Sequence, residues 1–320
     1  MNRLEGFKSI ALGTEIDIAG TFIYNGIREF NRMQTFYFES ESFSFLYLIS
    51  VGIERLQKIL IILLENPNKD KIEFLEKDLI THNHQELHRR ICESKNIDLP
   101  SVQNDFLQTL STFYKSCRYD RFSHGTEYNK EKKLLIGFIS KHLEIEIQID
   151  GLFVTPNDDR IKTFIGRTVG KIARNYYSCI KKRSYELNIY TYELRFESPA
   201  YKIFQPKFKE ESVQEQYVNE QIALKELLVY LINTKERSGF YEFLQSINPL
   251  EFDIELLQEY VSEICVGKIS QGLIDETETL YEEFEINIKD RLEMINCIDN
   301  PCICWDVDDE YDDEYNEEDY

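Results

Sequence analysis

Long apolar runs are missing from this sequence. The run at 59–64 has only six residues, whereas a membrane-spanning helix needs roughly 20. The first residues, MNRLEGFKSIALG, also lack the long apolar stretch and cleavage site of a secretory signal. We therefore expect a soluble protein with no membrane contact.

Cysteine is scarce and odd in number. Seven cysteines in 320 residues, with no secretory signal, do not form the pattern of a disulfide framework. We expect a cytoplasmic protein in which most cysteines act as small core residues. Cys297, Cys302 and Cys304 lie close together but lack a fourth ligand at a spacing typical of zinc sites.

Positive charge is in deficit, because 58 Asp/Glu residues oppose 37 Lys/Arg and give a net charge of −21. Residues 305–320 hold ten of these acids and no base, so the rest of the chain carries about −11. Dense like charge without aliphatic residues cannot form a core, so we expect this tail to be disordered. It has three interpretations: a solubility tail, an autoinhibitor that occupies basic residues of the same chain, or the binding element for a partner protein.

Apolar residues recur at steps of three and four along most of the chain, which is the period of a helix. The helical segments predicted in this way are 43–64, 79–95, 102 to about 123, 128–142, 160–183 and much of 211–296. Ser101, after Asp98-Leu99-Pro100, is a candidate N-cap. Residues 143–149 alternate strictly and 185–196 are ambiguous, so a short β-hairpin is an alternative there.

These patterns predict an all-α fold in three parts. Residues 1–205 would form a helical domain that includes the basic helix, residues 206–304 a second helical region, and residues 305–320 the acidic tail.

The helix predicted at 160–183 carries eight Lys/Arg and no acid, which is anomalous in so acidic a chain. One interpretation is a track for the phosphate backbone of RNA, with Tyr176 or Tyr177 available for stacking. The alternative is a solvated face, or a dock for the acidic tail. The basic residues that we expect to contact RNA are Arg160, Arg167, Lys171, Arg174 and Lys181, together with Arg121 outside this helix.

An arginine and a histidine lie close together in FYKSCRYDRFSHG, residues 113–125. Arg118 can bind a phosphate in a forked contact and offset charge in a transition state. His124 titrates near neutrality and can move a proton. On a regular helix the two side chains would point about 120° apart, so either a break near Gly125 or a second chain would have to complete the site.

Three segments of the chain, and their order along it, resemble the HEPN families. Residues 118–124 fit the families' Arg-x(4–6)-His motif, the segment THNHQELHRRI at 81–91 is similar to their His-Asn/Asp-Leu-x-x-Leu element, and GIERLQKIL at 52–60 resembles their second helix. The resemblance implies an all-α bundle, a homodimer with the motif at its interface, and metal-independent endoribonuclease activity in toxin or antiviral defence. It also implies that Arg118 binds the scissile phosphate, that His124 transfers a proton, and that Glu54 or Lys58 orients the arginine.

A non-catalytic protein is the alternative. Tyr119 stands where catalytic HEPN members often have Asn, Asp or His. Arg118 would then pair with a carboxylate such as Asp120 or Glu54, and His124 would favour a helix C-terminus. Such a chain would be a helical interaction protein that regulates a partner. A third hypothesis is a defence sensor that binds a nucleotide or a phage component.

The histidines and glycines do not predict a metal or cofactor site. Of His82, His84 and His88, only the last two share a helix face, and no third ligand is apparent nearby. The string GRTVGKI at 166–172 is one residue too short for a P-loop and has Ile where Ser or Thr must bind magnesium. We therefore expect neither metal nor cofactor.

Overall fold

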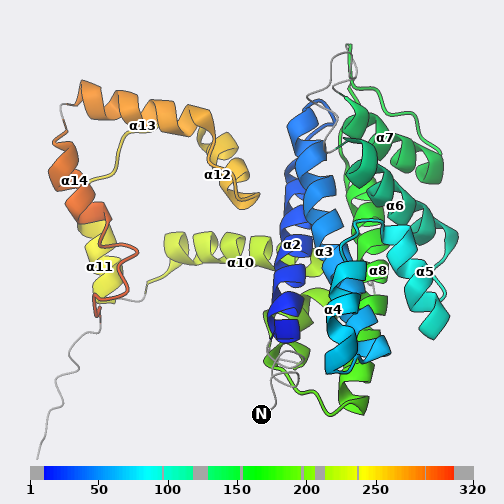
Figure 1. Cartoon of the computed structure of the whole chain (residues 1–320). Coiled ribbons are helices and arrows are strands. Elements are labelled where there is room, and N and C mark those ends of the chain that lie inside the picture. Colours follow the sequence, from blue (N-terminus) through cyan, green and yellow to red (C-terminus); the bar gives the residue numbers. More distant parts are fainter. Residues whose placement is uncertain are drawn as a thin grey trace, which may run out of the picture. The chain divides into compact units, whose positions relative to one another are not determined.

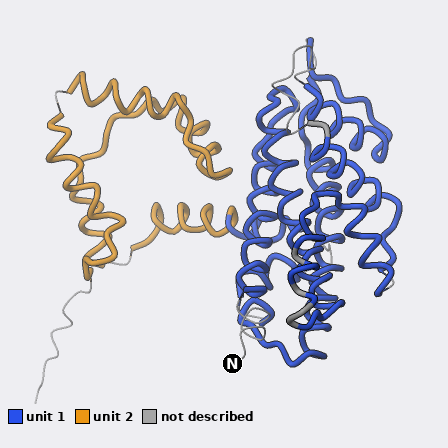
Figure 2. The backbone as a smooth tube through the Cα atoms, in the orientation of Figure 1, with its two compact units in different colours: residues 1–220 blue, residues 221–320 orange. Residues whose placement is uncertain are grey.

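The computed structural model describes residues 11–95, 97–117, 129–151, 154–195, 198–205, 213–235, 238–284 and 286–305. These residues are mostly helical, which confirms the predicted all-α fold (Figure 1). The chain divides into two compact units, residues 1–220 and 221–320 (Figure 2). Within the described ranges, no helix combines the length and apolar character that crossing a membrane requires.

Two long helices, α2 (Leu12–Arg32) and α3 (Glu39–Glu65), lie side by side in the first unit (Figure 1). Sequence analysis did not predict α2, although Ile16, Ile23 and Ile27 follow a helical period and are fully or almost fully buried. Gly52 lets the two backbones approach, because a Cβ there would lie 2.5 Å from Cγ1 of Ile23.

The single helix predicted at 79–95 is wrong. The chain forms α4 (Lys69–Asp78), a non-helical turn, and then α5 (His84–Ser94). The gap at 79–83 carries His82 up to α3, as described below. The next helix, α6 (Ser101–Thr112), has Pro100 as its N-cap, so the prediction that Ser101 is the cap is also wrong.

Helix α6 continues directly into a π-helical turn, η2 (Phe113–Cys117). The segment that contains Arg118, Arg121 and His124 follows η2 and lies outside the described residues. The chain is next described as α7 (Lys130–Leu143). Phe113 is fully buried, with its ring centroid 5.4 Å from that of Phe43, so the π-turn is anchored in the core.

No β-hairpin forms in the described part of the middle region. Residues 145–149 belong to no helix or strand, and Glu144 before them adopts a left-handed conformation with φ 54°. The backbone carbonyl of Gln148 accepts a hydrogen bond from Thr155 N at 2.8 Å, while Ile147 is buried. The alternation therefore reflects an irregular segment whose isoleucines pack on the core. The second ambiguous stretch, 185–196, begins in the last turn of α8, and its described part then forms the short 3₁₀ turn η4 (Tyr192–Leu194).

Helix α8 (Asp159–Glu186) has the two faces that the sequence predicted. Its inner stripe is buried against α3 and α6, with Ile165, Ile172 and Tyr176 fully buried. Asp158 caps the helix, because its carboxylate accepts a hydrogen bond from Ile161 N at 2.9 Å. The short helix α9 (Pro199–Phe204) then packs against α2 and α8.

Helices are the only regular elements among the described residues of the second unit. Its elements are the C-terminal part of α10 (Gln214–Asn233), then α11 (Gly239–Ser246), α12 (Leu257–Cys265), α13 (Gln271–Glu283) and α14 (Ile288–Ile295). Charge divides sharply between the two units. Residues 1–220 contain 31 Lys/Arg and 31 Asp/Glu, whereas residues 221–320 contain 6 and 27, so the whole net charge of −21 belongs to the second unit.

Trp305, the first residue of the predicted acidic tail, packs on α11. The centroid of its ring lies 4.7 Å from that of Phe243 and 5.5 Å from that of Phe240. Residues 306–320 lie outside the described residues.

Candidate functional site

A carboxylate on α3 holds two basic side chains. Oε1 of Glu54 lies 2.6 Å from Nζ of Lys58, and Oε2 lies 2.9 Å from Nδ1 of His82. Glu54 is buried, with 8% of its surface exposed, whereas the side chains of Lys58 and His82 are 22% and 45% exposed, so water reaches these contacts from the side of the basic partners. Both carboxylate oxygens therefore have a basic partner.

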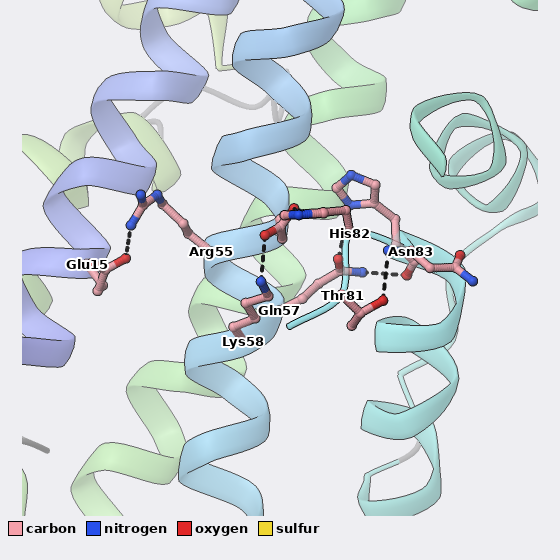
Figure 3. Close-up of polar contacts among 9 residues, drawn as sticks. Glu15, Arg55, Gln57, Lys58, Thr81, His82 and Asn83 are labelled. Carbon is pink, nitrogen blue, oxygen red and sulfur yellow. Dashed lines mark hydrogen bonds and ion pairs between the residues drawn. The ribbon is translucent and has the colours of Figure 1, made fainter. Parts of the chain in front are cut away.

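Local sequence explains how the three residues meet. Lys58 follows Glu54 by one helical turn, which places both on one face of α3. His82 comes from the turn before α5, and its Nδ1 meets the second oxygen of the Glu54 carboxylate. Figure 3 shows Lys58 on α3 and His82 on this turn. The amide of Gln57 donates to the backbone oxygen of His84 at 2.9 Å and ties this turn to α3.

Tyr114, in η2, covers the histidine. The rings of His82 and Tyr114 are stacked, with their centroids 4.1 Å apart and an interplanar angle of 24°. Tyr114 is buried, whereas 45% of the His82 side chain remains exposed. π-helical turns occur often at functional sites, and this one places an aromatic wall four residues before Arg118 in the sequence.

A cavity of about 680 Å³ opens beside this cluster. Glu54, Lys58, His82 and Tyr114 all contribute to its wall, together with residues of α2 and further residues of α3. An ion pair between Glu15 and Arg55 joins α2 to α3 in the same wall (Figure 3). The rest of the lining is mostly apolar, and it includes Leu12, Tyr47, Val51, Ile59, Ile62 and Leu79.

Behind the cavity lies a buried polar network that supports the turn. His84 is fully buried, and its Nδ1 lies 3.1 Å from Oε1 of Gln57. Nε2 of Gln57 also donates to Tyr176 OH at 3.1 Å, and that hydroxyl lies 2.9 Å from Nδ1 of His88. Burial lowers the pKa of His84 to about 4, so this imidazole is neutral at pH 7. Burial also raises the pKa of the Tyr176 hydroxyl and lowers the pKa of His88.

Proton transfer is within the capability of the Glu54–His82 pair. A carboxylate that binds Nδ1 of a histidine favours the tautomer with the proton on Nδ1 and stabilises the imidazolium. The second ring nitrogen of His82, Nε2, can then accept or donate a proton. Lys58 adds a positive charge at the same carboxylate. His84 is two residues away but buried and neutral, so it serves the fold rather than this chemistry.

The structure brings together some predicted site residues and separates others. Glu54 and Lys58 meet as described, while Arg118, His124 and Arg121 lie outside the described residues. On α8, Arg160, Arg167 and Lys171 line a second cavity. Arg174 is absent from that lining, and Nζ of Lys181 lies 4.8 Å from the centroid of the Tyr201 ring. The predicted basic stripe is therefore split along the helix.

Sequence reasoning missed the contacts that define the cavity. His82 was noted in the HEPN-like segment and among the histidines weighed as metal ligands, and nothing indicated that it meets Glu54. Tyr114 and the Glu15–Arg55 pair were not recognised either. The one available signal was the spacing of Glu54 and Lys58, because contacts across helices depend on a fold that periodicity does not specify.

Metal-binding patterns do not assemble in the described part of the chain. No group of three or more His, Cys, Asp or Glu side chains there is placed to hold a metal ion. His84 and His88 bind Gln57 and Tyr176 instead of sharing a ligand. Residues 166–172 lie within α8 and form no phosphate-binding loop.

Comparisons of the chain with family models, with curated proteins and with solved structures gave no match. The resemblance to HEPN families therefore stays a prediction from short motifs.

Proposed function

We propose that this protein is a metal-independent endoribonuclease of the HEPN type. The observation that carries the proposal is the buried Glu54 carboxylate, which holds His82 at 2.9 Å and Lys58 at 2.6 Å in the wall of a cavity. η2 also belongs to this wall through Tyr114, and the Arg118–His124 motif follows η2 directly in the sequence.

In the proposed reaction, the ribose 2′-hydroxyl attacks the adjacent phosphorus as its proton passes to a base. The bond from phosphorus to the 5′-oxygen breaks, and that oxygen receives a proton. The products are a 2′,3′-cyclic phosphate and a free 5′-hydroxyl, with no change of oxidation state. Arg118 binds the phosphate in a forked contact, and His124 acts in one of the two proton transfers.

The described residues add two details to this scheme. Glu54 already holds Lys58 and His82, so a guanidinium from Arg118 would join an existing charge cluster rather than a lone carboxylate. His82, with its exposed side chain and its Nδ1 on Glu54, is a candidate for the second proton transfer. The proposal includes a homodimer in which two copies of the motif share one cleft, and a role as a toxin or in antiviral defence.

The test is cleavage of labelled total RNA or tRNA in EDTA by the purified full chain. Wild type is compared with Arg118→Ala, His124→Ala and His82→Ala, and thermal unfolding of each variant checks that it folds. Light scattering during size-exclusion chromatography gives the oligomeric state. Cleavage that disappears in the Arg118 and His124 variants supports the proposal, whereas no cleavage by folded wild type contradicts it.

A second candidate function is a helical interaction protein that regulates a partner. The second unit favours it, because that unit carries the whole net charge of −21 and displays apolar side chains on α10. Ile232 is 80% exposed and Val229 is 57% exposed. If folded wild type does not cleave RNA, this second function becomes the favoured one.

A further inference from the structure

The second cavity lies along α8 and is separate from the Glu54 cluster. Its volume is about 1020 Å³, and its wall contains the first part of α8, the start of α6 and Leu143 at the end of α7. Arg160, Arg167 and Lys171 line it, and Asp159 is the one acid in the wall. None of its lining residues contributes to the cavity beside Glu54.

Helical geometry explains this cationic wall. Arg167 and Lys171 follow Arg160 by seven and eleven residues, so all three project from one face of α8. Nη2 of Arg160 donates to the backbone oxygen of Leu143 at 3.1 Å, which positions its guanidinium at one end of the groove. The track from Arg160 to Lys171 is about 16 Å long, at about 1.5 Å per helical residue.

A buried acceptor belongs to a residue in the wall of the same groove. Gln103, near the start of α6, lines the groove and is only 7% exposed, and its Oε1 accepts no hydrogen bond from the described residues. A buried carbonyl without a donor is unfavourable, and a ligand that carries both phosphate and a hydrogen-bond donor would satisfy it together with the three cations of the wall.

An aromatic ring completes the wall. Phe164 is partly exposed and lies on the same face of α8 as the cations. Its ring is held by Phe138, with centroids 5.6 Å apart and an interplanar angle of 26°. Cations for phosphate, an aromatic side chain, and an acceptor for a hydroxyl or amino group are the features that single-stranded nucleic acid requires.

We propose that this groove binds a short single strand of RNA through its phosphates, with Gln103 accepting a hydrogen bond from a ribose hydroxyl or a base amino group. A track about 16 Å long matches several stacked nucleotides, at roughly 3.4 Å each, better than one mononucleotide. The inference rests on the proposed ribonuclease function only for the choice of RNA as the ligand. Binding here would select the substrate at a surface apart from the cleavage site.

The test measures binding of a short labelled oligonucleotide to the full chain by fluorescence anisotropy in EDTA. RNA and DNA of the same sequence are compared, because DNA has no 2′-hydroxyl and cannot be cleaved by the proposed reaction. Lys171→Glu is paired with Lys182→Glu, which makes the same charge change on the same helix outside the groove. Gln103→Leu removes the acceptor at nearly constant size, and thermal unfolding checks that each variant folds.

We expect Lys171→Glu to weaken binding of both strands on the order of tenfold and to lower the slope of log K against log salt by about 0.7. Lys182→Glu should change affinity by less than about twofold. Gln103→Leu should weaken binding of RNA, and an equal loss for DNA would assign the donor to a base instead of the 2′-hydroxyl.

Three results would overturn the proposal. If wild type binds neither strand, the groove is not a binding site for single strands. If the two lysine variants lose affinity equally, the effect is long-range charge and not contact in the groove. A mononucleotide that competes as well as the strand would replace the strand site with a nucleotide pocket. Because DNA binding is independent of cleavage, an inactive protein that still shows the lysine difference would separate this groove from the proposed ribonuclease function.

Discussion

Glu54 and His82 lie 28 positions apart in the sequence, and their Oε2 and Nδ1 atoms meet at 2.9 Å. This contact joins the middle of α3 to the turn before α5 and places a histidine with a fixed ring orientation in a cavity wall. The proposed function depends on this pair, because it provides a proton-transfer group in the same cavity wall as Tyr114 of η2, which the Arg118–His124 segment follows in the sequence.

Glu54→Gln tests what the carboxylate contributes. The substitution keeps the size of the side chain but removes the charge that faces Nδ1 of His82 and Nζ of Lys58, so we expect RNA cleavage to fall on the order of 100-fold. The matched control is Glu86→Gln on α5, where the carboxylate is exposed and pairs with Arg89. Initial cleavage rates in EDTA measure both variants. Full activity in Glu54→Gln would show that the charge of Glu54 is not part of the chemistry.

His84 predicts a loss of stability in acid. Its pKa is about 4 in the folded protein and about 6.5 in an unfolded chain, so the unfolded state binds a proton first as the pH falls. The free energy of unfolding therefore falls by roughly 3 kcal/mol because of His84. This stability is fully present above pH 6.5 and is lost progressively as the pH falls to 4. Urea unfolding at pH 7 and pH 5 measures the difference. His84→Gln, which does not titrate, should reduce this pH dependence, and an unchanged dependence would contradict the prediction.

Two glycines give opposite predictions for the same substitution. A Cβ at Gly52 would lie 2.5 Å from Cγ1 of Ile23 and 3.1 Å from the backbone oxygen of Ala19, so Gly52→Ala should destabilise the protein by about 1–3 kcal/mol. At Gly137 on α7, apart from the adjoining residues and backbone of the helix itself, no atom of the described residues lies within 4 Å of the point that a Cβ would occupy, so Gly137→Ala should stabilise by roughly 0.5–1 kcal/mol. Denaturant unfolding of both variants tests the close approach of α2 and α3, and equal effects would contradict it.

Deleting residues 306–320 should raise the affinity for RNA. The deletion removes ten acids and changes the net charge from −21 to about −11, while Trp305 stays in place on α11. The increase should shrink as salt is added, because screening weakens the repulsion or competition that the tail exerts. Anisotropy titrations at low and moderate salt compare the two chains. Identical affinities at low salt would identify the tail as a plain solubility element.

Helical periodicity was sufficient to predict α3, α7 and α8, because each presents a continuous apolar face to the core. It failed at 79–83, where apolar spacing continues while the backbone leaves the helix to carry His82 to α3. The strand pattern also failed at 143–149. Alternation there matched a strand, but no partner strand exists among the described residues.

The candidate site was less predictable than the fold. Glu54 and Lys58 are neighbours on one helix, so their pairing follows from spacing alone. The contacts of Glu54 with His82, of His82 with Tyr114, and of Gln103 with the α8 groove each join separate elements. Such contacts arise from tertiary packing, which a single sequence does not specify.

The most direct measurement is cleavage of labelled RNA in EDTA by wild type beside Arg118→Ala and His124→Ala. We expect wild type to cut and leave 2′,3′-cyclic phosphate ends, and each substitution to lower the rate at least on the order of 100-fold while the protein stays folded. Folded wild type that leaves RNA intact, or variants that cut as fast as wild type, would contradict the ribonuclease proposal.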